Sequence, residues 1–277
     1  MKNNLIINEP LVSVKWLFQN IETKNLVILD ASMKKVTSND ASIAEKQIPK
    51  ARFFDIKNKF STTNAPFPNT VPSEEQFTIE ARALGINNDS AIVVYDEIGI
   101  YTSPRVWWLF KVFGYDNVAV LDGGLPEWNA SGYEVEFMKK FSGELGDIAF
   151  SYRSEYFNFF NDIEIIKKED TKRIVDARSK KRFKGLVAEP RQGLRSGIIP
   201  NSINLPYTDM LNDNCLKSKA ELFTIFNTLD IRNKSLIFSC GSGITACILA
   251  LGAEIAGFNK LSVYDGSWTE YGSLILE

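Results

Sequence analysis

The chain contains no histidine among its 277 residues. Imidazole is the side chain that most often acts as a general base near neutral pH, and it is the commonest protein ligand for metals. Its absence excludes Cys–His and Ser–His–Asp catalysis and removes most kinds of zinc site. Any chemistry here must therefore proceed without imidazole, and we expect neither a metal nor an organic cofactor.

Cysteine is also scarce, with only Cys215, Cys240 and Cys247 in the chain. Three cysteines with such spacing form neither a disulfide framework nor a metal-ligand pattern. They suit a reducing compartment, in which a reactive thiol survives. The first ten residues lack the apolar core of a signal peptide, so we expect a cytoplasmic protein.

Excess charge of either sign is missing too, because the formal net charge is only −2. No basic surface is expected, and the sequence therefore predicts no nucleic-acid partner and no acidic-membrane partner. Residues 235–253 are uncharged and long enough to raise the question of a membrane span. A Gly-Ser-Gly break at 241–243 favours a buried strand followed by a helix instead.

The second half of the chain repeats the first at low identity. Residues 26–32 parallel 173–179, and residues 90–96 parallel 234–240. The last pair of segments ends at Asp96 and Cys240, which are 144 residues apart. A period of that length indicates a duplicated domain rather than a solenoid.

In each copy, short β-branched runs alternate with helical stretches, which predicts an α/β fold. We expect two domains, each a mostly parallel sheet with helices on both faces. The N-terminal domain is expected over residues 1–138 and the C-terminal domain over 157–277. Residues 139–156 are polar, contain two glycines and are interpreted as the linker.

Cys240 stands at the most informative point of the sequence. It follows the apolar run 235–239 and precedes a Gly-rich loop and a helical pattern. Ligands of parallel sheets bind beyond the carboxyl ends of the strands, and backbone N–H groups at a helix start favour an anion there. The pattern predicts a nucleophilic cysteine; the alternative, a buried inert thiol, leaves the glycines unexplained.

The other candidate positions are interpreted differently. Cys247 lies among alanine, isoleucine and leucine and is expected in the core. Cys215 follows the polar stretch 212–214 and is expected to be a loop thiol, with a role in resolving an oxidised Cys240 left open. Asp96 stands where the second copy has Cys240, so the first domain lacks the thiol nucleophile and we expect it to be inactive.

The loop at 240–246 resembles the active-site loop of the rhodanese-like sulfurtransferases. Gly241, in place of a basic residue directly after the cysteine, resembles the 3-mercaptopyruvate branch of that family. The resemblance covers nearly the whole chain. Its other motifs are Phe-Phe-Asp-Ile at 53–56, Pro-Arg-Val-Trp-Trp at 104–108, Leu-Asp-Gly-Gly at 121–124 and Tyr-Asp-Gly-Ser-Trp at 264–268.

The resemblance implies two rhodanese-like domains and a sulfurtransferase activity. A small-molecule donor, 3-mercaptopyruvate or thiosulfate, would pass sulfur to Cys240 as a persulfide. A thiol such as thioredoxin, or cyanide, would then accept it. The loop residues expected to hold the charged adduct and the substrate are Gly241, Gly243, Ile244 and Thr245.

Two arginines are further candidates. The family holds the carboxylate and carbonyl of mercaptopyruvate with two arginines nine residues apart, and here those positions are Arg182 and Arg191. Planar guanidinium groups suit small oxyanions. The alternative is a solvated basic loop, for which Lys180, Lys181 and Lys184 are better suited.

Ser242 could donate a hydrogen bond to the substrate or to the bound sulfur. In the family this serine is linked to a histidine and an aspartate of the first domain, and the corresponding residues here are Asn69 and Lys57. The assisting triad is therefore missing. Either activity with mercaptopyruvate is weak, with Ser242 contributing only a neutral hydrogen bond, or Asn69 and Lys57 meet a different substrate.

Two other functions are alternatives to a sulfurtransferase. A cysteine phosphatase or arsenate reductase needs an arginine at the end of its loop, and the residues there are Thr245, Ala246 and Cys247. A non-enzymatic module that stores sulfur or binds a partner is the second alternative. The complete loop around Cys240 argues against it.

Overall fold

The structure is a computed structural model that describes residues 4–34, 45–229, 231 and 233–275. The chain forms two compact units. The first contains most of the chain up to Arg153 together with Asp213–Cys215. The second contains Asn64–Thr70, Ser154–Asn212 and the residues from Leu216 onward. Each unit thus includes one short segment from the other half of the sequence.

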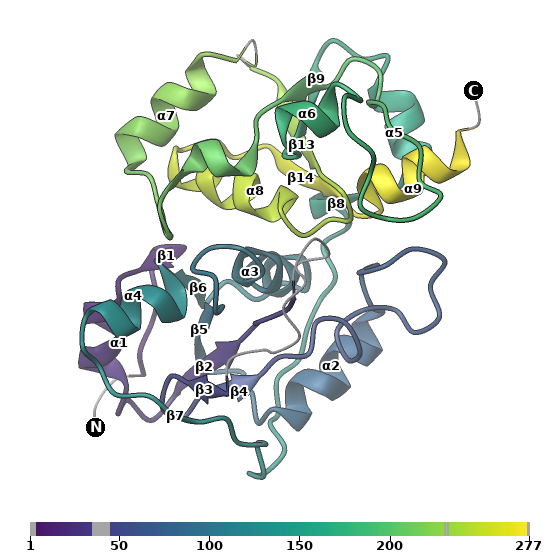
Figure 1. Cartoon of the computed structure of the whole chain (residues 1–277). Helices are drawn as coiled ribbons and strands as arrows, with labels where there is room; N and C mark the ends of the chain where they lie inside the picture. The colour runs from purple at the N-terminus through teal and green to yellow at the C-terminus, as the bar shows by residue number, and fades with distance from the viewer. Residues whose placement is uncertain (1–3, 35–44, 230, 232, 276–277) are drawn as a thin grey trace. The chain divides into compact units, whose positions relative to one another are not determined.

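The first unit is built on a five-stranded sheet in the order β1-β6-β5-β2-β4, with every neighbouring pair parallel. Its strands are β1 Leu11–Val12, β2 Leu26–Asp30, β4 Arg52–Phe53, β5 Ala91–Tyr95 and β6 Val118–Leu121. Its helices are α1 Val14–Asn20, α2 Glu74–Ala83, α3 Ser103–Val112 and α4 Gly124–Ala130 (Figure 1). The short strands β3 Lys46–Gln47 and β7 Glu136–Phe137 pair antiparallel beside it.

The second unit repeats this plan with the sheet order β8-β14-β13-β9-β10, again parallel throughout. Its strands are β8 Phe157–Asn158, β9 Lys172–Asp176, β10 Ile203–Asn204, β13 Ser235–Ser239 and β14 Leu261–Tyr264. Its helices are α5 Phe160–Ile166, α6 Lys180–Phe183, α7 Lys219–Asn227, α8 Ala246–Ile255 and α9 Ser267–Leu274. Short pieces are η1 Ser154–Tyr156, η2 Tyr207–Met210, β11 Leu211–Asn212 and β12 Cys215–Leu216. The predicted α/β fold with two mostly parallel sheets is confirmed.

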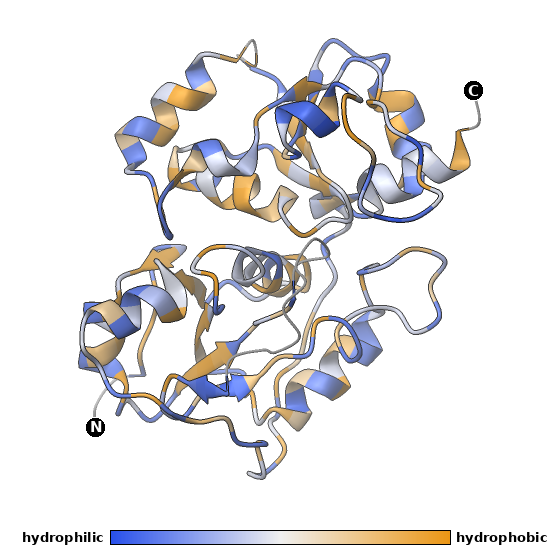
Figure 2. Ribbon diagram, in the orientation of Figure 1, coloured by the Kyte–Doolittle hydropathy of each residue, from blue (hydrophilic) through white to orange (hydrophobic). Residues whose placement is uncertain are grey.

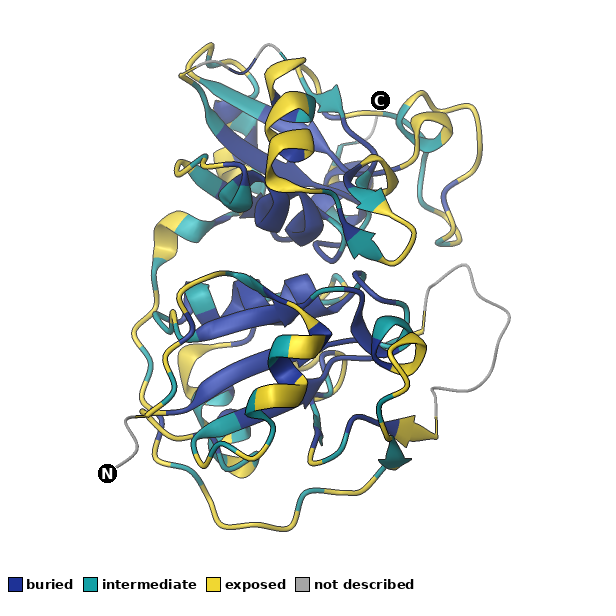
Figure 3. Cartoon of the chain, turned by 90° about the vertical axis from the view of Figure 1, so that its left-hand side faces the viewer, coloured by how far each residue is buried: buried dark blue, intermediate teal, exposed yellow. Residues whose placement is uncertain are grey.

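Hydrophobic burial explains the position of the central elements. All residues of β5, Ala91–Tyr95, are buried, and so are residues 246–253 of α8. Strands covered by helices on both faces are apolar throughout, rather than alternating with polar residues. Figure 2 shows hydrophobic strands in orange at the centre of the first unit, and Figure 3 shows strands of both sheets in dark blue. Exposed positions gather on the outer helices and loops (Figure 3).

Local signals set the helix ends. Ser73 Oγ accepts the N–H of Gln76 at the start of α2. At the start of α7, Ser218 and Glu221 form a reciprocal capping box, which satisfies N–H groups that the helix leaves unpaired.

The stretch interpreted as a linker packs on the first unit for most of its length. The Gly146 N–H donates to the Arg82 carbonyl at 2.8 Å, and the Ser151 N–H donates to the Phe113 carbonyl at 3.0 Å. Ile148 is fully buried. The sequence does not reveal that Ile148 is buried, because the stretch in which it lies is mostly polar. The compact first unit therefore extends to Arg153, while the domain boundaries at 138 and 157 stay a prediction.

Asp96 organises the loop between β5 and α3. Its carboxylate is completely buried, immediately after the last residue of the central strand. It accepts hydrogen bonds from the backbone N–H groups of Ile98, Gly99, Tyr101, Thr102 and Ser103, and from the Ser103 hydroxyl. The loop is thus a nest of N–H groups closed around one anion that belongs to the chain itself.

We predict that Asp96→Ala lowers the free energy of unfolding by about 2–4 kcal/mol, because buried N–H groups would lose their acceptor. Urea denaturation followed by circular dichroism measures the effect. Asp89→Ala, at an exposed carboxylate of the same unit, is the control and should stay within about 0.5 kcal/mol of the parent protein. An unchanged midpoint for Asp96→Ala would contradict a structural role for this carboxylate.

Candidate active site

Cys240 lies at the carboxyl end of β13, the central strand of the second unit, and its side chain is 2% exposed. The loop that follows leads into α8. Gly243 has φ +77° and Gly99, its counterpart in the first unit, has φ +117°. Side chains other than glycine rarely adopt this region. The two loops therefore share one turn geometry, with Asp96 and Cys240 at the same position.

Ser267, at the start of α9, clamps the loop from behind. Its Oγ accepts the N–H groups of Cys240 at 3.1 Å and Gly243 at 3.2 Å, and donates to the Tyr264 carbonyl at 2.8 Å. The Gly241 carbonyl accepts the N–H of Thr269 at 2.9 Å. The predicted contact of the Gly243 N–H with the substrate therefore competes with a bond inside the protein. Ser267 is a residue that the sequence does not identify as part of the site, although it lies in the Tyr-Asp-Gly-Ser-Trp motif at 264–268.

Other N–H groups of the loop have no acceptor among the residues that the structure describes. Among the described residues, no hydrogen bond employs the backbone N–H of Gly241, Ser242, Ile244 or Thr245. In the first unit, the equivalents of Ser242 and Thr245 are Ile98 and Tyr101, which donate to Asp96. The loop after Cys240 therefore offers donors at positions where its counterpart binds a carboxylate.

The structure brings both predicted arginines to this loop. A Cβ atom placed on Gly241 would lie 3.1 Å from Nη2 of Arg182 and 3.8 Å from Nη1 of Arg191. Arg182 comes from α6, a helix that Ser179 caps. A side chain at position 241 would crowd Arg182, so the glycine lets a guanidinium approach the backbone beside Cys240. Two positive charges thus stand next to the loop.

Glu189 is a site residue that the sequence analysis missed. Its carboxylate is fully buried between Arg178 and Arg182: it accepts from Nη1 of Arg178 at 2.8 Å and from Nε of Arg182 at 3.2 Å. Arg178 also bonds to both carboxylate oxygens of Asp176 and is buried against the Trp268 ring. Glu189 is the one acidic residue between Arg182 and Arg191, and this was the feature of the sequence that could have indicated an ion pair with them.

This ion-pair network orients Arg182 rather than leaving it in solvent. Removing one partner of a buried pair leaves an uncompensated charge and is strongly destabilising. Arg178 is fully used within the network, because it bonds to both Asp176 and Glu189. Arg182 keeps a side chain that is 25% exposed while Glu189 holds it from the buried side.

Ser242 receives two hydrogen bonds on its side chain. Nη2 of Arg191 donates to Ser242 Oγ at 3.1 Å, and Nδ2 of Asn69 donates to the same oxygen at 3.0 Å. Asn69 lies in the segment Asn64–Thr70, which belongs to the second unit. Lys57 is exposed on the first unit. Of the two residues in the family's histidine and aspartate positions, Asn69 is the one that the structure places on Ser242.

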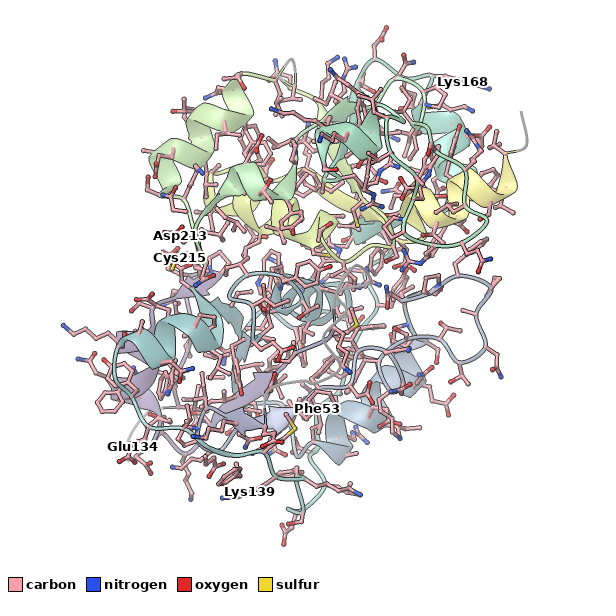
Figure 4. All side chains as sticks on the ribbon, in the orientation of Figure 1. Phe53, Glu134, Lys139, Lys168, Asp213 and Cys215 are labelled. Carbon is pink, nitrogen blue, oxygen red and sulfur yellow. The ribbon has the colours of Figure 1, made fainter. Side chains whose placement is uncertain are left out.

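The remaining cysteines differ from Cys240. Cys247 is fully buried in α8 and its thiol donates to the Gly243 carbonyl at 3.3 Å. Cys215 is half-buried next to Asp213 in the first unit (Figure 4). Burial, helped by the charges of Asp122 and Glu127, raises the pKa of Cys215 to about 11. A thiol with so high a pKa is almost fully protonated near neutral pH and is a poor nucleophile.

The described residues contain no group of three or more Cys, Asp or Glu side chains that could hold a metal ion. Within the same ranges, no helix has the length and apolar composition required to cross a bilayer.

Comparison with known proteins identifies the family. A model of the rhodanese-like domain matches residues 13–131 and again residues 163–274. The chain is 40% identical over 291 residues to "Thiosulfate/3-mercaptopyruvate sulfurtransferase 1, mitochondrial" of Arabidopsis thaliana, covering 96% of this chain and 76% of the relative. It is 35% identical over 269 residues to the 3-mercaptopyruvate sulfurtransferase of Escherichia coli K12, covering 95% and 94%.

The fold agrees with this match. The crystal structure of the Escherichia coli 3-mercaptopyruvate sulfurtransferase SseA superposes with a TM-score of 0.85 at 32% identity, covering 94% of this chain and 99% of that one. The chain belongs to the family of two-domain rhodanese-like sulfurtransferases.

Proposed function

We propose that this protein transfers a sulfane sulfur from 3-mercaptopyruvate, and less readily from thiosulfate, through a persulfide on Cys240. A thiol such as thioredoxin, or cyanide, then accepts the sulfur. The names of the relatives supply the two donors. The observation that carries the proposal for this chain is the correspondence between the loops after Asp96 and after Cys240.

The two side chains have matching reach. In aspartate, the charged oxygens are the second atom beyond Cβ. In a cysteine persulfide, the charged outer sulfur is also the second atom beyond Cβ. The first loop shows where backbone N–H groups converge on such a charge. A Cys240 persulfide anion would place its outer sulfur at the corresponding point in the second loop, where the Ser242 and Thr245 N–H groups can donate.

The reaction proceeds in two displacements. The Cys240 thiolate attacks the thiol sulfur of 3-mercaptopyruvate, and the carbon–sulfur bond breaks with its electron pair left on carbon as an enolate. The proton of the donor thiol ends on that carbon, which gives pyruvate, while Cys240 carries the persulfide anion. An acceptor thiolate then attacks the outer sulfur and releases the Cys240 thiolate.

Arg182 and Arg191 supply the positive charge for this sequence. Both guanidinium groups lie beside Gly241. A donor carboxylate bound by them would therefore lie next to the cysteine loop. Glu189 fixes the orientation of Arg182 so that its fork is held in place before the donor arrives. Pre-organised charge of this kind stabilises a developing anion without reorganisation during the reaction. The first domain, with Asp96 at the end of its central strand, carries no sulfur.

A reducing compartment suits this chemistry, and we place the protein in the cytoplasm on the strength of its three free cysteines. An oxidising compartment would put the Cys240 thiolate at risk of disulfide formation or oxidation.

Cys240→Ser is expected to abolish sulfur transfer from either donor, because a hydroxyl cannot form the persulfide. Sulfide or thiocyanate release measures turnover. Cys247→Ser and Cys215→Ser are the matched controls and should keep most of the activity, since neither thiol lies at the nucleophile position. Full activity in Cys240→Ser would sink the mechanism.

Arg191→Ala is expected to lower kcat/KM for 3-mercaptopyruvate about tenfold to over a hundredfold, which corresponds to losing one charge-assisted contact of about 1.5–3 kcal/mol. Lys181→Ala removes an exposed charge from the same basic stretch and should leave kcat/KM within about twofold. Unchanged kinetics of Arg191→Ala with every donor would remove this residue from the site.

Cys240→Asp tests the correspondence of the two loops without requiring activity. A carboxylate at position 240 should accept the loop N–H groups as Asp96 does, so the variant should unfold at a higher urea concentration than Cys240→Ala. If Cys240→Asp is the less stable of the two, the loop does not favour an anion at this position.

A further inference from the structure

Asn69 donates hydrogen bonds to Ser242. An imidazole in its place would not fix the direction of these bonds in the same way. Nδ2 of Asn69 lies 3.0 Å from Ser242 Oγ and 3.3 Å from the Ser242 carbonyl oxygen. A carbonyl oxygen only accepts hydrogen bonds, so the nitrogen of the amide, and not its oxygen, must face Ser242. The orientation of the Asn69 amide is therefore set by the backbone.

This orientation fixes the polarity of the serine. Ser242 Oγ accepts one bond from Asn69 and a second from Arg191, whose guanidinium can only donate. A hydroxyl has two acceptor positions and one hydrogen, and both acceptor positions are filled. The hydroxyl hydrogen must then point to a third group. Toward that third group Ser242 can only donate, and the positive charge on Arg191 strengthens it as a donor.

The backbone conformation at Asn69 is one that suits asparagine. Its φ is +61°, in the left-handed region that asparagine tolerates better than most residues. The segment Asn64–Thr70 belongs to the second unit although its sequence lies in the first half of the chain. Within it, the Thr70 hydroxyl donates to the Phe67 carbonyl at 2.8 Å and closes a tight turn around Asn69.

Building on the proposed function, we propose that Asn69 is a positioning residue that selects 2-oxo thiol donors over thiosulfate by holding Ser242 as a hydrogen-bond donor to the departing enolate oxygen. When the carbon–sulfur bond of 3-mercaptopyruvate breaks, negative charge develops on the carbonyl oxygen. The Ser242 hydroxyl stabilises that charge and transfers no proton. Thiosulfate releases sulfite and develops no enolate, so it gains nothing from this donor.

An amide has no protonation change near neutral pH, and this separates Asn69 from a histidine in the same place. A histidine would both accept and donate, and would titrate with a pKa near 6.5. The stabilisation that Asn69 gives through Ser242 is therefore independent of pH between about pH 5 and 8.

The test measures kcat and KM of Asn69→Ala with both donors and cyanide as the acceptor. With 3-mercaptopyruvate, kcat should fall about three- to tenfold, the effect of one neutral hydrogen bond, while KM changes little. With thiosulfate, both constants should stay within about twofold. Asn64→Ala is the matched control, because Asn64 has φ +58° in the same segment and reports the backbone cost of alanine there. It should change neither donor's kinetics.

Two further variants separate positioning from a general loss of structure. If Asn69 acts through Ser242, the double variant Asn69→Ala/Ser242→Ala should be no slower than Ser242→Ala alone. Asn69→His should add a limb near the imidazole pKa to the pH–rate profile with 3-mercaptopyruvate and none with thiosulfate.

Equal losses with both donors, additive losses in the double variant, or an Asn69→His profile with the same limb for thiosulfate would overturn the role of Asn69. None of these results would affect the persulfide on Cys240. That part fails instead if the parent protein transfers sulfur from neither donor or if Cys240→Ser remains active.

Discussion

Backbone N–H groups that converge beyond the end of a central parallel strand are the feature on which both units depend. In the first unit the Asp96 carboxylate accepts these N–H groups and closes the nest. In the second unit the corresponding turn carries Cys240. There the hydroxyl oxygen of Ser267 accepts the N–H groups of Cys240 and Gly243. One copy therefore stabilises its loop with a permanent charge. In the other, the N–H groups of Gly241, Ser242, Ile244 and Thr245 make no hydrogen bond among the described residues, and we propose that they stabilise the persulfide.

The positively charged groups around Cys240 are consistent with this difference between the two loops. A nest that stabilises a transient anion is most effective when other positive groups are already in place. Glu189 and Asp176 bind Arg178 deep in the unit, and Glu189 also holds Arg182 next to Gly241. The buried carboxylates serve as supports for guanidinium groups rather than as acids or bases. Asn69 and Arg191 each donate a hydrogen bond to Ser242, one from an uncharged amide and one from a permanently charged guanidinium, so the candidate site is built without histidine.

Local pattern was sufficient to predict the fold class, the repeat and the position of Cys240. A strand, a glycine-rich turn and a helix are adjacent in sequence, so their geometry can be read without long-range contacts. Arg182 and Arg191 were identified through the family resemblance, in which two arginines nine residues apart bind the donor, and the structure places both beside Gly241. Their contact with donor stays a prediction, as do the roles of Ile244 and Thr245.

Contacts between distant segments could not be predicted. Asn69 and Ser242 are 173 residues apart, and the sequence could show only that a histidine is replaced, not that the replacement reaches the serine. Glu189 was hidden among exposed neighbours, because burial depends on how the loop folds back over Arg178. Ile148 was hidden in the same way within a polar stretch that packs on the first unit.

The most direct test of the central claim is mass spectrometry of the protein after incubation with 3-mercaptopyruvate in the absence of an acceptor. We expect one additional sulfur atom on the peptide that contains Cys240, and its loss on addition of cyanide or reduced thioredoxin. Added sulfur confined to Cys215 or Cys247, or turnover with no sulfur on Cys240 at any stage, would contradict the account.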